Sequence, residues 1–69
     1  METKTADTAA GVIQVIGEAF SPVRGSTKIW IGTLDDGRFA VASRWQYEVI
    51  TKDRSKADKV FKRLTKASA

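Results

Sequence analysis

Residues 28–44 read KIWIGTLDDGRFAVASR, and this stretch decides the fold. Two runs rich in apolar and β-branched residues flank Asp36 and Gly37. Asp-Gly between such runs is the strongest short-range signal for a β-hairpin, because both central residues of a type I′ turn need positive φ. We therefore predict that Lys28–Asp35 and Arg38–Arg44 are paired antiparallel strands joined by a two-residue turn.

A two-residue turn fixes which side chains share each face of this hairpin. One face then carries the cross-strand pairs Leu34 with Phe39, Gly32 with Val41, and Trp30 with Ser43. The other carries Thr33 with Ala40, Ile31 with Ala42, and Ile29 with Arg44. The first face is larger and more aromatic, so we expect it to be the core face, with Trp30 inside. We expect the second face, with Arg38 and Arg44 at its ends, to be solvated, covered by the N-terminal segment or used for binding.

The composition restricts the functions open to a chain of 69 residues. A single domain of this size is close to the limit at which one core is stable unaided. The absence of Cys and His excludes disulfides, thiolate nucleophiles, imidazole chemistry and the usual zinc ligands. No apolar run is long enough to span a bilayer, and no signal-peptide pattern follows Met1. We expect a complete small cytoplasmic protein with no metal, no cofactor and no membrane partner.

The net charge of +4 is unevenly distributed along the chain. Residues 1–51 hold five basic and six acidic side chains, whereas residues 52–69 hold seven basic and two acidic ones. The excess of positive charge therefore belongs to the C-terminal segment. Such asymmetry favours an acidic or polyanionic partner.

The other segments complete a small α+β fold. We expect residues 1–10 to be a flexible tail and residues 11–69 to be one domain. The run Gly11–Phe20 fits an amphipathic helix or a strand bent at Gly17, and its β-branched residues favour the strand. Residues 21–27 then form a surface connection, and residues 45–47 a turn or bend. A further strand at Glu48–Lys52 gives an antiparallel meander of three or four strands.

A C-terminal helix is predicted over Asp53–Ala67. Ser55 is the expected N-cap, with Asp58 as the acidic half of a capping box. An apolar stripe at helical spacing is expected to pack on the sheet and consists of Ala57, Val60, Phe61 and Leu64. An adjoining basic stripe consists of Lys56, Lys59, Lys62, Arg63 and Lys66.

No catalytic pattern accompanies these elements. The hairpin turn and the helix start already explain most of the carboxylates, and no glycine-rich phosphate loop occurs. We therefore expect a binding protein and not an enzyme. The candidate contact residues are the basic stripe, which would meet phosphates or an acidic surface, and the residues near the strand junction. The latter are Arg38, Arg44, Trp45 and Tyr47.

Residues 28–66 resemble a known architecture, three strands followed by an amphipathic helix. The resemblance rests on Trp30, the DDGRF turn at 35–39 and the apolar stripe of the helix. It is to the DNA-binding domains at the N-termini of phage integrases and in a plant transcription factor family. The resemblance implies a sheet that enters the major groove of DNA.

A second resemblance is one of class. A small, cofactorless single domain with strongly partitioned charge is similar to accessory proteins of phages and mobile elements, including anti-CRISPR inhibitors. That resemblance implies a rigid scaffold that occludes a surface of a nuclease or nucleoprotein complex.

Three functional hypotheses follow. The leading one is an inhibitor or modulator that binds a nucleic-acid-handling protein complex, for example a CRISPR effector, through an acidic protein surface. The second is a direct DNA-binding module that uses the sheet and the basic helix. The third is a structural or oligomerising subunit, in which Ile29 and Ile31 pair with another copy. The oligomeric state stays open.

Overall fold

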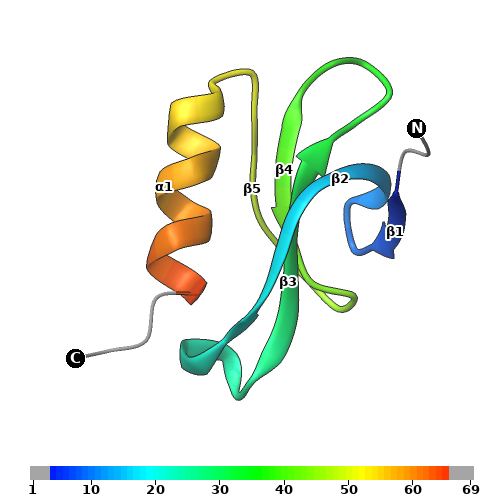
Figure 1. Cartoon of the computed structure of the whole chain (residues 1–69). Helices are drawn as coiled ribbons and strands as arrows, with labels where there is room; N and C mark the ends of the chain where they lie inside the picture. The colour runs from blue at the N-terminus through cyan, green and yellow to red at the C-terminus, as the bar shows by residue number, and fades with distance from the viewer. Residues whose placement is uncertain (1–3, 66–69) are drawn as a thin grey trace.

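The structure is a computed structural model that describes residues 4–65. Five antiparallel strands form one sheet in sequence order, followed by one helix (Figure 1). The elements are β1 (Thr5–Thr8), β2 (Gly11–Ser21), the short 3₁₀ helix η1 (Pro22–Arg24), β3 (Thr27–Thr33), β4 (Phe39–Ala42), β5 (Tyr47–Thr51) and α1 (Arg54–Thr65). The α+β class with a C-terminal helix agrees with the sequence-based prediction, which gave one or two strands too few. No helix in residues 4–65 has the length and apolar character that crossing a bilayer requires.

The additional strand is β1, where a flexible tail was expected. Thr8 closes the turn between β1 and β2: its hydroxyl donates to the carbonyl of Gly11 at 2.8 Å and accepts from the N–H of Ala10 at 3.1 Å. The carbonyl of Lys4 also accepts from the N–H of Val15 at 2.8 Å. The tail prediction was wrong for residues 5–8 because pairing with β2 orders a polar segment that lacks periodicity of its own.

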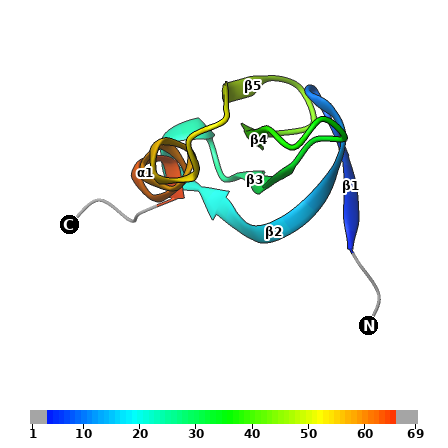
Figure 2. The ribbon, with the colours of Figure 1, turned by 90° about the horizontal axis from the view of Figure 1, so that it is seen from above.

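The ambiguous run 11–20 is a strand. Its pairing with β3 shifts by one residue between Val15 and Gly17, so Ile16 is the extra residue of a β-bulge. The prediction of a strand bent near Gly17 is confirmed. In Figure 2 the sheet curls, and β1 with the start of β2 lies far from α1.

The predicted hairpin exists, but its register differs by one residue. Thr33 pairs with Phe39 and Ile31 with Val41. The loop has three residues, because Leu34 donates to the carbonyl of Arg38 at 2.7 Å and accepts from the N–H of Gly37 at 3.0 Å. Gly37 has φ 88°, as expected when a type I turn is followed by a left-handed glycine. The prediction of a two-residue turn was wrong because Asp35 belongs to the loop.

A slip of one residue exchanges the two faces of a strand, and the predicted core face changes accordingly. Ile29 and Ile31 are 0% and 4% exposed and pack with Val41 beneath α1. Trp30, expected in the core, is only half-buried and lies on the opposite face. A face of Ile29 and Ile31 open to a second copy is therefore excluded.

The face of the sheet opposite α1 is covered at one end by the N-terminal part of β2. Ile13 is 1% exposed, and its Cδ1 lies 3.1 Å from the position of a Cβ built on Gly32. Ala40 and Ala42, on the same face as Gly32, are fully buried. The N–H of Ala9 also donates to the carbonyl of Ser43 at 3.0 Å, which ties the β1–β2 turn to the end of β4. The predicted second face is therefore divided: Ile29 and Ile31 lie under α1, whereas Ala40 and Ala42 lie on the face that carries Gly32.

Helix α1 is fixed at both ends. Its N-cap is Asp53, whose Oδ1 accepts from the N–H groups of Ser55 at 2.9 Å and Lys56 at 3.4 Å. Ser55, the predicted cap, is already inside the helix, because α1 begins at Arg54. At the other end the buried hydroxyl of Ser21 donates to the carbonyl of Leu64 at 2.6 Å. The expected apolar stripe faces the sheet.

Candidate binding site

Aromatic and charged side chains lie together on the part of the sheet that neither α1 nor the N-terminal part of β2 covers. Register pairs Glu18 with Trp30 and Phe20 with Lys28, so these four side chains share one face. We call this the outer face. Phe20 is 64% exposed although it lies within a strand. A large apolar ring that is mostly in water contributes little to folding, so this face is a candidate for contact with a partner.

A network of polar contacts holds the outer face in place. Glu18 accepts a hydrogen bond from the indole N–H of Trp30 at 3.1 Å and pairs with Lys4 at 2.8 Å and Lys28 at 3.4 Å. These cations, first of all the hydrogen bond from Lys4, hold the pKa of Glu18 below its usual value. Lys28 also lies about 6 Å from the ring centres of Phe20 and Trp30, within the range of cation–π attraction. Trp30 therefore has one preferred orientation.

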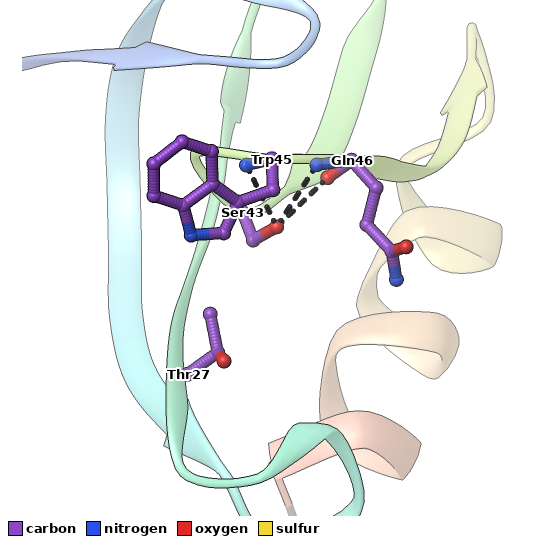
Figure 3. Close-up of a pocket in the computed structure, with 4 residues that line it drawn as sticks. All are labelled: Thr27, Ser43, Trp45 and Gln46. Carbon is purple, nitrogen blue, oxygen red and sulfur yellow. Dashed lines mark hydrogen bonds between the residues drawn. The ribbon is translucent and has the colours of Figure 1, made fainter.

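Trp45 is presented by a rigid turn at the end of β4. The Ser43 hydroxyl accepts from the N–H groups of Trp45 at 3.2 Å and Gln46 at 3.1 Å and donates to the Gln46 carbonyl at 3.1 Å (Figure 3). Ser43 itself is 3% exposed. The indole of Trp45 projects away from this turn and is 79% exposed. The hydrogen bonds of Ser43 fix the backbone that carries Trp45, so little backbone entropy is lost when the ring binds.

Two shallow hollows border the Trp45 ring. One, of about 370 Å³, is lined by Thr27, Lys28, Trp30, Arg44 and Trp45. We call it the Trp30–Trp45 groove. The other, of about 330 Å³, is lined by Thr27, Ser43, Trp45 and Gln46. The groove thus combines two indoles with an ammonium and a guanidinium group.

Comparison with known proteins identifies no family for this chain. The chain matches no protein-family model, no curated protein and no solved structure at a significant level.

The structure separates the predicted contact residues into three groups. Arg44 and Trp45 line the groove. Tyr47 is 59% exposed but lines neither hollow beside Trp45. Arg38 lies at the β3–β4 turn, where it forms an ion pair with Asp36 at 2.7 Å. The N–H of Arg38 also donates to this carboxylate and is the main reason why the pKa of Asp36 is lowered.

The third group is the basic stripe of α1. Its described members, Lys56, Lys59, Lys62 and Arg63, are all exposed, and Lys66 lies outside the described residues. We call these four the basic ridge. Within residues 4–65 no member of the ridge forms an ion pair, whereas Lys4, Lys28, Arg38 and Arg54 all do. The ridge belongs to α1, on the opposite side of the sheet from the groove.

Phe20, Lys28 and Trp30 were not predicted to be site residues. Only the register of β2 against β3 brings these residues together. That register depends on the bulge at Ile16, which no local sequence pattern specifies. Trp30 was assigned to the core because of its size, and the slip at the hairpin reversed its face.

The side chains of the outer face and the groove offer stacking surfaces and ionic groups. The pKa values of Glu18 and Asp36 are both lowered, mainly by hydrogen bonds from Lys4 to Glu18 and from the N–H of Arg38 to Asp36. No group of three or more carboxylates in residues 4–65 has the arrangement of a metal site. Indoles stack on planar groups, and Lys28 and Arg44 attract anions.

Proposed function

We propose that this chain is a non-enzymatic nucleic-acid-binding protein and that the Trp30–Trp45 groove binds a single strand. The observation that carries the proposal is the composition of the groove, in which two indoles stand beside Lys28 and Arg44. Proteins that bind single strands combine these two features: aromatic rings stack on bases, and cations follow the backbone. The exposed ring of Phe20 extends the stacking surface along β2.

A single strand fits this surface better than the major groove of a duplex. Reading a duplex requires Arg, Lys, Asn or Gln side chains that reach base edges, and stacking requires unpaired bases. The outer face offers rings, and its charged groups are partly engaged with Glu18. This preference departs from the mode of binding that the resemblance to integrase domains implies.

The first test is the fluorescence anisotropy of a labelled single strand at two salt concentrations. Phosphate contacts from Lys4, Lys28 and Arg44 give a slope of about −2 in log affinity against log salt, at about −0.7 per contact. Between ~50 and ~200 mM salt the affinity then falls about twenty-fold. No binding at the lower concentration would overturn the proposal.

The second test compares two exposed aromatic residues. Trp45→Ala should weaken binding of the strand by about 5- to 150-fold, since a stacked base contributes about 1–3 kcal/mol. Trp45→Phe should recover part of this loss. Tyr47→Ala is the matched control, because it also removes an exposed ring but one outside both hollows. Equal losses in the two alanine variants would remove the groove from the mechanism.

A second candidate function is occlusion of a nucleic-acid-handling protein complex, as anti-CRISPR inhibitors do. It is favoured by the 79% exposure of Trp45 next to Arg44, because Trp and Arg dominate the energetics of protein interfaces. This candidate predicts no binding to free strands. It also predicts that stoichiometric protein stops DNA cleavage by a purified RNA-guided nuclease and that Trp45→Ala relieves the block. Unchanged cleavage by every nuclease tested would count against it.

A further inference from the structure

We propose that the basic ridge is a second binding surface, for the phosphate backbone of a duplex, so that the chain binds a junction between single-stranded and double-stranded nucleic acid. The inference rests on the proposed function of the Trp30–Trp45 groove and adds the structure of the substrate. It starts from the four cations of α1 that the groove does not use.

Helix stability does not explain these cations. Lys62 and Arg63 lie in the last turn of α1, where the helix dipole favours positive charge. Lys56 lies in the first turn, where the dipole disfavours it. Lys59 is three or four residues from each of the other three, and like charges at this spacing repel one another. In residues 4–65 no carboxylate pairs with any of them. The helix therefore carries repulsion that a polyanion would relieve.

The chemistry of the ridge selects a duplex backbone as its partner. It presents ammonium and guanidinium groups without an aromatic ring, because Phe61 packs against the core. Such a surface contacts phosphates without stacking on bases. A duplex carries about one charge per 1.7 Å of its axis, twice the density of one of its strands. From Lys56 to Arg63 the helix extends about 10 Å, which matches about three base-pair steps.

The position of the two surfaces sets the geometry of the substrate. The groove lies on the outer face, and α1 packs against the opposite face. The molecule measures 35 × 24 × 21 Å, so a strand that passes from the ridge around the protein to the groove must cover at least about the two smaller dimensions, 21–24 Å. At a rise of about 3.4 Å per nucleotide, this distance corresponds to about seven nucleotides.

The experiment compares four labelled probes by anisotropy: a single strand, a blunt duplex, and the same duplex with a tail of about 3 or about 15 nucleotides. Two linked contacts raise affinity through their effective concentration, so we expect the long tail to bind at least about tenfold tighter than the single strand or the blunt duplex. The short tail should bind like the blunt duplex. Equal affinity of the long-tailed duplex and the single strand would overturn the inference, while single-strand binding itself would leave the proposed function intact.

Charge reversal assigns the duplex contact to the ridge. Lys59→Glu should remove the advantage of the long-tailed duplex and leave single-strand affinity within about twofold, because the groove is untouched. It should also raise the melting temperature, since the introduced carboxylate would attract Arg63 one turn away. Arg38→Glu is the control with the same change of charge at the remote hairpin turn. If Lys59→Glu and Arg38→Glu reduce the extra affinity for the long-tailed duplex equally, net charge and not the ridge causes that affinity, and the inference is wrong.

Discussion

Replacing Gly32 with Ala tests how closely the N-terminal part of β2 approaches β3. A Cβ built on Gly32 overlaps the carbonyl oxygen of Gln14 and lies 2.9 Å from its carbonyl carbon and 3.1 Å from Cδ1 of Ile13. Ordinary contacts of a Cβ begin at 3.4 Å, so the backbone of β2 must move by about half an ångström or more. Gly17→Ala is the matched control, because its Cβ meets only Cγ2 of Ile31 at 3.4 Å.

The expected cost is large for a domain of this size. Overpacking costs about 1–3 kcal/mol, and a rigid backbone neighbour places Gly32→Ala at the upper end. A 69-residue domain has about 3–10 kcal/mol of stability in total. Gly32→Ala should therefore lower the melting temperature by about 10–20 °C. Gly17→Ala should be neutral or stabilise the fold by up to about 1 kcal/mol, because Ala restricts the unfolded chain.

Urea unfolding followed by tryptophan fluorescence measures both variants. We expect the transition midpoint of Gly32→Ala to fall with an unchanged slope, which indicates a loss of stability and not a change of the unfolded state. A Gly32→Ala midpoint equal to that of the wild type would refute the close crossing of β2. If Gly17→Ala also lost much of its unfolding free energy, any side chain at these glycines would be destabilising. The Cβ distances would then not explain the effect of Gly32→Ala.

Two further predictions concern the helix cap and the outer face. Asp53→Ala should destabilise the protein by about 0.5–2 kcal/mol and Ser55→Ala by much less, and the opposite order in urea unfolding would restore Ser55 as the cap. In a Trp45→Phe variant the only remaining tryptophan is Trp30, which donates to Glu18. The pKa of Glu18 is lower in the folded state than in the unfolded state. The ionised Glu18 therefore contributes its full stabilisation above the usual titration range of a glutamate and loses it as the pH falls through the folded-state pKa. We expect Trp30 fluorescence to change only in acid, below the usual titration range of a glutamate, and a Glu18→Gln variant that shows the same transition would contradict this assignment.

The fold was predictable to the extent that local chemistry specifies it. The turn around Gly37 and the apolar stripe of α1 are short-range patterns, and both gave the correct elements. The register was not predictable in this way, because Asp35 is compatible with the end of a strand and with a three-residue loop. That single residue decides whether Trp30 or Ile31 faces the helix.

The candidate site was predictable only in part. Arg44 and Trp45 stood out in the sequence because a Trp next to an Arg outside a periodic run has no evident place in a core, and the structure puts both at the groove. Phe20 and Lys28 join them through pairing of β2 with β3, which depends on a bulge. The strand β1 escaped prediction because its order comes from its partner, through bonds such as that from Val15 to Lys4.

The order of the elements also bears on synthesis of the chain. Each strand pairs with the strand before it, so the sheet can assemble as the strands leave the ribosome. The helix that shields Ile29, Ile31 and Val41 follows all five strands in the chain. At about 5–20 residues per second, the 14 residues from Thr51 to Thr65 take about 1–3 s. Without these residues the apolar face has no helix to cover it, so a chain that stops before Arg54 would keep that face exposed and tend to aggregate.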